Sequence, residues 1–233
     1  MALHRSFDYD QLAMVPPVRS LNSASAARGG GQPQSRRAAI VQAALELFAT
    51  RGYGLTTMAD IGERVGIRGP SLYKHVESKQ DVLAEIMLGT MDLLLAHQRA
   101  AIATTTDARE QLRRAAEAHA RYHASHRYEA FVGNRELNSL DEPARAQVIE
   151  RRSAYEQTLR GLIETGCRLG IFSVMSPRLA SYAILDMGMG IPMWFDPQGE
   201  SSAEEIAYLH GDFALQIVGC PASPALRTGR PGD

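Results

Sequence analysis

The chain has 233 residues, of which 45% are hydrophobic and 6% aromatic, enough for one small and one medium domain. No apolar run approaches the ~18–20 residues that span a bilayer, and the start lacks the basic and apolar regions of a secretory signal. Cys167 and Cys220 are isolated and give no disulfide framework, so we expect a cytoplasmic protein that does not contact the membrane.

The formal net charge of −1 is distributed unevenly along the chain. Residues 1–80 carry ten Lys or Arg against six Asp or Glu, and the remaining residues carry fifteen against twenty. A basic N-terminal part attached to an acidic body is typical of a protein that places the basic part on nucleic acid.

Residues 1–34 are expected to form a flexible N-terminal arm. Prolines and glycines recur at positions 16, 17, 29–31 and 33, among scattered Ser and Ala. Arg36 and Arg37 follow the arm directly and could lie along phosphates or enter the minor groove. The alternative is that the arm is an inert tail.

Residues 56–66 predict a short helix with both ends marked. Thr57 is expected as its N-cap, with Asp60 three positions later as the capping-box partner. Gly66 supplies the left-handed residue that ends the helix.

A second, very short polar helix is expected over residues 71–76, with Gly69 as its N-cap and Pro70 in the first turn. Ser78 then opens a third helix, again with an acidic residue, Asp81, three positions later. Two helices set at a sharp angle, the second short and polar, describe a helix-turn-helix, which predicts DNA binding.

This segment resembles the DNA-binding domain of the tetracycline-repressor (TetR) family of bacterial regulators. The resemblance includes a first helix over residues 39–52 that ends on glycine, followed by Thr57, Ile61, Gly66, Leu72, Tyr73, His75, Ser78, Lys79 and Leu83. Two positions depart from the family pattern: Arg68 stands where a small hydroxyl residue commonly caps the recognition helix, and Val76 replaces a frequent Phe.

The short polar helix is expected to enter the major groove of DNA. Arg68 and Ser71 are the candidates for base edges, because arginine reads guanine with two hydrogen bonds. Phosphate contacts are expected from the following side chains and from the N-termini of two helices, with the role of Tyr73 implied by the family. The complete predicted contact set is Arg36, Arg37, Thr57, Arg68, Gly69, Ser71, Tyr73, Lys74, His75 and Lys79.

Beyond residue 78 the apolar spacing predicts only helices. They cover residues 79–103, a helix capped at Asp107, one around residues 128–137, a long one from residues 141–143 to near Gly170, one opened by Ser176 and Pro177, and a last one from residue 201 or 202. The expected fold is all-α with about nine helices. It comprises a three-helix helix-turn-helix domain (35–80), a helical effector-binding and dimerisation domain (81–219) and a disordered tail (220–233).

Gly188, Gly190 and Pro192 interrupt one of these helices. Glycine and proline inside a helix cost on the order of 1 and 3 kcal/mol each, so a compensating feature is expected. A kink there could line a cavity or shape a dimer interface, and the alternative is a kink packed into the core. The predicted effector-pocket residues are Leu94, His119, Tyr122, Phe131, Arg135, Arg152, Tyr155, Met187 and Trp194.

The Met193-Trp194-Phe195 run and, earlier in the chain, the Arg151-Arg152 pair are similar to segments of a TetR subgroup. The regulators of that subgroup respond to acyl-CoA thioesters. The resemblance implies a repressor without a cofactor that is released from DNA by a small apolar effector. An acyl-CoA is the leading candidate, and a hydrophobic drug is the alternative. Arginine side chains such as Arg135 could meet the anionic groups of that ligand.

A homodimer is expected, because one head covers too few base pairs for useful specificity and two-fold pairing suits a near-palindromic operator. By resemblance, the interface is expected on the helices over residues 177–194 and 201–218. The candidate interface residues are Leu179, Ala183, Ile206, Leu209, Phe213 and Ile217.

Two other hypotheses receive less support. His119, His123 and His126 have a spacing that suits one face of a metal site, with Asp186 or Glu136 as a further ligand, but histidines in such a helix are more often solvated or hydrogen-bonded, and no metal is assigned. No nucleophile elbow, phosphate-binding loop or paired-cysteine zinc site indicates an enzyme. A helical ligand-binding protein that does not bind DNA remains the alternative from another class. The residues do not distinguish a repressor from an activator.

Overall fold

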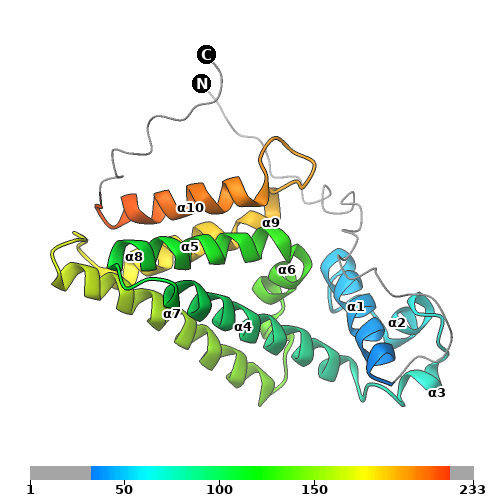
Figure 1. Cartoon of the computed structure of the whole chain (residues 1–233). Helices are drawn as coiled ribbons and strands as arrows, with labels where there is room; N and C mark the ends of the chain where they lie inside the picture. Colours follow the sequence, from blue (N-terminus) through cyan, green and yellow to red (C-terminus); the bar gives the residue numbers. More distant parts are fainter. Residues whose placement is uncertain (1–32, 221–233) are drawn as a thin grey trace, which may run out of the picture. The chain divides into compact units, whose positions relative to one another are not determined.

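The computed structural model describes residues 33–220, and every regular element within them is a helix. This confirms the all-α fold class. The chain divides into two compact units, of which the first ends at Val82 and the second begins at Leu83 (Figure 1). We call them the head and the body. Within residues 33–220, no helix combines the length and apolarity needed to cross a membrane.

The head contains α1 (Pro33–Arg51), α2 (Met58–Arg64), α3 (Gly69–Leu72) and the start of α4 (Lys79–Ala103). Its core joins Ile40 and Phe48 of α1 to Ile61 of α2 and Leu72 of α3, all of them buried. Helix α1 begins two residues inside the predicted arm; residues 1–32 of that arm and 221–233 of the predicted tail lie outside the described residues.

The predicted ends of α2 are confirmed. The Thr57 hydroxyl accepts a hydrogen bond from the Asp60 N–H at 3.2 Å, and the Asp60 carboxylate accepts one from the Thr57 N–H at 2.7 Å. Gly66 has a φ of +68°, the left-handed value expected after the helix. The Asp81 N–H likewise donates to the Ser78 hydroxyl at 3.0 Å at the start of α4.

The predicted bounds of α3, residues 71–76, were wrong by two residues at the start and four at the end, since the helix covers Gly69–Leu72. Its N-cap is Arg68 rather than Gly69, because the extended Arg68 places its carbonyl to accept from the N–H groups of Ser71 and Leu72. Gly69 can be helical immediately before Pro70, since it has no Cβ to meet the proline ring. Helical hydrogen bonding continues as isolated turns as far as Val76, whose N–H donates to the Leu72 carbonyl.

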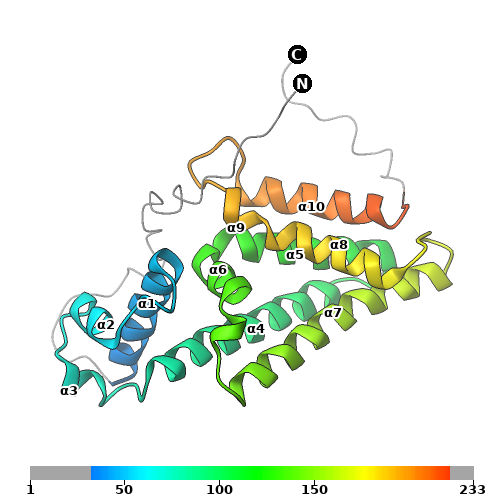
Figure 2. The ribbon, with the colours of Figure 1, turned by 180° about the vertical axis from the view of Figure 1, so that it is seen from behind.

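The body contains the rest of α4 and six further α-helical segments with one short 3₁₀ turn. These are α5 (Ala108–Ser125), α6 (Arg127–Arg135), the 3₁₀ turn η2 (Leu137–Ser139), α7 (Ala144–Arg168), α8 (Pro177–Met189), α9 (Ile191–Trp194) and α10 (Ala203–Ile217). Helix α5 packs against α7, α8 and α10 (Figures 1 and 2). The principal core of the body joins these helices through Leu112, Leu159, Ile163, Ile184 and Leu215.

Two glycines allow close approach in the body. A Cβ at Gly211 of α10 would lie 2.8 Å from Glu117 Cγ of α5, so α10 can approach α5 only with glycine there. A Cβ at Gly188 of α8 would lie 2.2 Å from Cδ2 of the His119 ring. The predicted helix interruption follows at once, since α8 ends at Met189 and α9 begins at Ile191. Gly188 therefore accommodates a buried side chain from α5.

Candidate DNA interface and effector cavity

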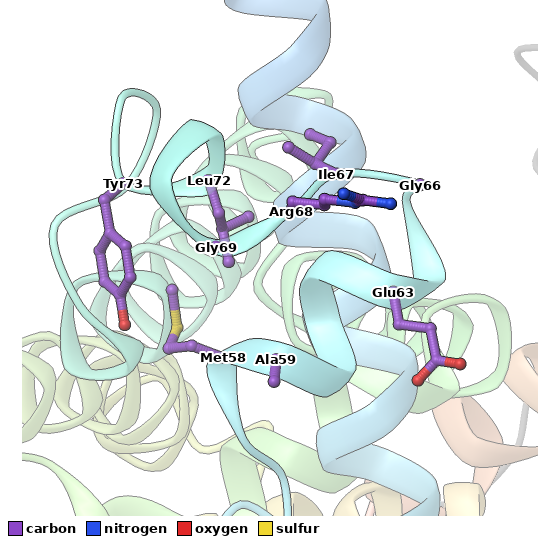
Figure 3. Close-up of a pocket in the computed structure, with 9 residues that line it drawn as sticks. All are labelled: Met58, Ala59, Glu63, Gly66, Ile67, Arg68, Gly69, Leu72 and Tyr73. Carbon is purple, nitrogen blue, oxygen red and sulfur yellow. The ribbon is translucent and has the colours of Figure 1, made fainter.

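The exposed surface of the helix-turn-helix carries several of the predicted DNA contacts. Arg68, Ser71, Tyr73 and Lys74 are all exposed, and the Tyr73 side chain retains 56% of its accessible area. Arg68 and Tyr73 also border a hollow of about 580 Å³ between α2 and α3 (Figure 3). Gly69 is exposed at the start of α3. The segment thus presents a guanidinium, an ammonium and two hydroxyls to solvent, which are the groups that read bases and bind phosphates.

Two predicted cations are held inside the head. Lys79 Nζ donates to the carbonyls of Tyr53 at 2.9 Å and Thr56 at 2.8 Å, and it lies 4.1 Å from the Tyr53 ring centre. Arg37 donates to the His75 carbonyl at 2.6 Å and pairs with Asp81 at 3.2 Å. Both side chains brace the segments around α3. These two side chains thus hold neighbouring segments in place, and only the backbone N–H of Lys79 at the start of α4 stays a predicted DNA contact.

The remaining predicted DNA contacts differ in how far they are exposed to solvent. Arg36 is exposed on α1, and His75 is half-buried. Thr57 is exposed, with its hydroxyl 2.6 Å from the Asp60 carboxylate. Because this hydroxyl also caps α2, Thr57 can offer a phosphate both a side chain and a helix N-terminus.

The body contains a cavity of about 500 Å³ walled by α4, α5, α6, α7 and α8. The interior is lined by buried residues, namely Thr90, Met91, Leu94, His119, His123, Ala130, Gly133 and Tyr155. The rim is lined by exposed and half-buried residues, namely Asn134, Arg152, Ser153, Glu156, Gln157, Arg160, Arg178, Tyr182, Leu185, Asp186 and Met189. The cavity thus has an apolar and aromatic interior and a polar mouth, as ligand pockets commonly do.

Four of the nine predicted effector residues line this cavity: Leu94, His119, Arg152 and Tyr155. The other five do not line it. Tyr122 and Phe131 are buried and Met187 is half-buried. Arg135 is exposed with its guanidinium 4.9 Å from the Phe131 ring centre, and Trp194 is 54% exposed.

Arg152 is the cation most deeply placed at the mouth of the cavity. Its guanidinium donates to the Gly133 carbonyl, and burial lowers its pKa. Among the described residues no carboxylate pairs with it, whereas its neighbour Arg151 pairs with Asp92 at 2.7 Å. A half-buried cation without an opposite charge favours an anionic ligand group.

His119 lies at a junction of three helices. Its Nε2 donates to the Leu185 carbonyl at 3.0 Å, so its Nδ1 carries no proton and accepts from the Tyr155 hydroxyl at 3.0 Å. His123 of α5 and His210 of α10 donate to the carbonyls of His119 and Ile184. Burial lowers the pKa of His119 well below its ordinary range and lowers the pKa values of His123 and His210 to about 4. All three are therefore neutral at physiological pH.

His126 does not join this cluster, because its ring stacks on Tyr122 with the centres 4.4 Å apart. The three histidines considered as metal ligands are thus engaged differently, and within residues 33–220 no group of His, Cys, Asp or Glu has a metal-binding arrangement.

An apolar face covers the outside of α8 and α10. Leu179, Ala183, Leu209, Phe213 and Ile217, five of the six predicted interface residues, are exposed there, and Leu179 retains 67% of its accessible area. Ile206 is instead half-buried against a small core cluster. Exposed residues that sequence reasoning did not select are Tyr182, Met189 and Tyr208. So many large apolar side chains on two neighbouring helices are typical of an interaction surface.

Comparison with known proteins covers most of the chain. The family model described as "Bacterial regulatory proteins, tetR family" matches residues 40–86. The family model described as "Tetracyclin repressor-like, C-terminal domain" matches residues 105–218. The HTH-type transcriptional repressor KstR2 of Rhodococcus jostii (strain RHA1) is 27% identical over 188 residues, which cover 80% of this chain and 92% of the relative.

Solved structures give the same result. A bacterial regulatory protein in the tetR family from Rhodococcus RHA1 is 30% identical with a TM-score of 0.76, over 83% of this chain and all of that one. AibR, in complex with isovaleryl coenzyme A and operator DNA, has the same fold with a TM-score of 0.70 at 24% identity, over 78% of this chain and 98% of that one.

A helix-turn-helix head with an exposed cationic recognition segment, joined to a helical body, defines a DNA-binding transcriptional regulator rather than an enzyme. The matches also identify the family of this regulator. The chain belongs to the tetR family of bacterial regulatory proteins.

Proposed function

We propose that the protein is a homodimeric repressor that binds a near-palindromic operator and is released from it by a small, largely apolar effector. On this proposal it acts in the cytoplasm. The observation that carries the proposal is the exposure of two cations that flank α3. Arg68 and Lys74 are open to solvent, and neither forms an ion pair among the described residues. The proposed repressor activity is supported by KstR2 of Rhodococcus jostii, a transcriptional repressor whose match covers 80% of this chain.

Quantitative DNA binding tests the proposed interface. Arg68→Ala should relax the preference at one operator position by about 1–3 kcal/mol, whereas Lys74→Ala should weaken all sequences alike and reduce the salt dependence. Arg99→Ala, at an exposed arginine of α4 within the body, serves as the control and should leave affinity unchanged. The interface assignment is wrong if Arg68→Ala and Lys74→Ala both bind the operator as tightly as the unaltered protein.

The apolar face on α8 and α10 supports a dimer of this chain. Dimerisation through these helices would bury side chains such as Leu179 and Phe213 that are now exposed. It would also join two heads into one two-fold unit, as a palindromic operator requires.

For the effector, we propose an acyl-CoA thioester. The cavity has a volume of about 500 Å³, within the range of small-molecule sites, and its interior suits an acyl group. The unpaired Arg152 at the rim, with Arg160 and Arg178 nearby, suits the phosphates of coenzyme A. The isovaleryl coenzyme A bound by AibR, which has the same fold, supports this class of ligand.

Titration of the operator complex tests the effector class. Acyl-CoAs of increasing chain length, the matching free acids and hydrophobic drugs are added, and DNA release is followed by fluorescence anisotropy. Release by thioesters should be lost in Arg152→Gln and retained in the control Arg151→Gln, whose arginine pairs with Asp92. Release by drugs or free acids but never by thioesters would contradict the acyl-CoA proposal and leave the repressor assignment in place.

A further inference from the structure

Two neutral histidines line the interior of the cavity, and they differ in how their ring nitrogens are used. His119 uses both nitrogens inside the protein, one on the Leu185 carbonyl and one on the Tyr155 hydroxyl. It therefore has no capacity left for a ligand. His123 uses only one of its two nitrogens.

The proton on His123 can be assigned from its partner. Its Nδ1 lies 2.9 Å from the His119 carbonyl, which can only accept, so Nδ1 carries the proton. Nε2 is then a bare acceptor, and among residues 33–220 it forms no hydrogen bond. Since Nδ1 is turned back to a carbonyl of its own helix, Nε2 lies on the outer edge of the ring, the side away from the α5 backbone. His123 retains 3% of its accessible area and lines the cavity, so this edge is the part of the ring that can meet a ligand there.

The surroundings keep this nitrogen an acceptor. Burial lowers the pKa of His123 to about 4, so the ring does not gain a second proton at neutral pH. Two buried hydroxyls lie nearby and interact with each other: that of Thr90, which lines the cavity, and that of Tyr122, which does not. The Tyr122 ring meets the His123 ring edge-on, with the ring centres 5.9 Å apart. Buried side chains nearly always have their polar atoms hydrogen-bonded, so an acceptor nitrogen at the cavity wall without a protein partner indicates a polar group of a ligand.

We propose that the cavity interior binds a hydroxyl group carried on the apolar part of the effector, with the ligand O–H donating to His123 Nε2. The Tyr122 O–H can donate to Thr90 Oγ1, which leaves the Thr90 O–H able to donate to the same ligand oxygen. The effector class is therefore a hydroxylated apolar molecule rather than a plain hydrocarbon chain. This inference rests on the cavity being the effector site of the proposed function.

The test uses the full-length protein without DNA or coenzyme A, so that it does not depend on the repressor or thioester assignments. The probes are 1-decanol, which can donate a hydrogen bond, and 1-methoxydecane, which cannot. Affinity is measured by calorimetry, and the ¹⁵N shift of His123 Nε2 is followed by NMR. Decanol should bind about three- to tenfold more tightly than the ether, the ratio expected from one neutral hydrogen bond, and should shift the Nε2 resonance.

The matched variant is His123→Asn, which keeps a donor for the His119 carbonyl and removes the distal acceptor. It should bind the two probes equally, whereas the control His97→Asn, at an exposed histidine of α4, should keep the preference for decanol. Equal affinity of decanol and the ether for the unaltered protein, or no change at His123 Nε2 with either probe, would overturn the proposal. Operator release by thioesters in the separate assay would then still stand, so failure of this subsite is distinguishable from failure of the proposed function.

Discussion

Replacing Gly188 with alanine tests whether the close contact between α8 and the His119 ring stabilises the body. A Cβ there would lie 2.2 Å from Cδ2 and 2.5 Å from Nε2 of His119, much closer than real Cβ contacts. The ring is not a free end that can swing aside, because its two nitrogens are bonded to α7 and α8. Gly188→Ala must therefore displace the ring or push α8 away from α5.

The magnitude follows from opposing effects. Overpacking of a well-filled core costs about 1–3 kcal/mol, and weakening the two hydrogen bonds of His119 adds about 0.5–1.5 kcal/mol for each one lost. Alanine in place of glycine inside a helix returns about 1 kcal/mol. With both hydrogen bonds lost, we therefore expect Gly188→Ala to lower the free energy of unfolding by about 1–5 kcal/mol.

Gly161→Ala in α7 is the matched control. No atom lies within 4 Å of a Cβ at that position, so only the helix-propensity effect remains, and this variant should be stabilised by up to about 1 kcal/mol. Urea unfolding at one fixed protein concentration compares the two variants, because a dimer's apparent stability depends on concentration. A Gly188→Ala protein as stable as Gly161→Ala would refute the packing argument, and a smaller loss in Gly188→Ala combined with His119→Ala would support it.

Three further predictions concern the histidine cluster, the apolar face and the α2 cap. The pKa values of His123 and His210 are about 4 when folded, below the ordinary 6.5, so the unfolded chain binds more protons between these values and stability falls as pH drops from about 6.5 to 4. Each residue contributes at most about 1.4 kcal/mol per pH unit. Urea titrations at pH 7 and 5 should show a smaller difference for His210→Gln, and an unchanged difference would count against the assignment. Phe213→Glu should give monomers by sedimentation and lose operator binding, whereas Ile149→Glu, at an exposed apolar residue of α7, should remain dimeric; two dimers would exclude this interface. Thr57→Ala should destabilise the head by about 0.5–2 kcal/mol in equilibrium unfolding, and no loss would mean that the cap contributes little.

Features set by residues close in sequence were predictable. The Thr57–Asp60 box, the left-handed Gly66 and the Ser176 cap each depend on side chains and backbone within four residues, and all three are present as expected. The start of α3 was misplaced for the same local reason, since several residues around Pro70 offered a carbonyl for the first helical bond.

The interactions of several candidate site residues could not be predicted, because their partners lie far away in the sequence. Lys79 was expected on DNA, but carbonyls 26 and 23 residues away hold its ammonium group. The rim arginine Arg178 and the unused nitrogen of His123 become visible only when α5, α7 and α8 are assembled around the cavity. Helical spacing identifies the face on which such residues lie, and it does not reveal which partner will satisfy each polar atom.

The bonding of Lys79 has a consequence for chemical labelling of the protein. The chain contains only two lysines, Lys74 and Lys79. Two carbonyls and an aromatic ring surround the ammonium of Lys79, whereas Lys74 is exposed beside the recognition segment. Amine-reactive reagents should therefore modify one side chain, Lys74, in preference to the other. A dye attached there would lie at the proposed DNA interface, and protection of the Lys74 amine by operator would provide a footprint of the bound state without any engineered residue.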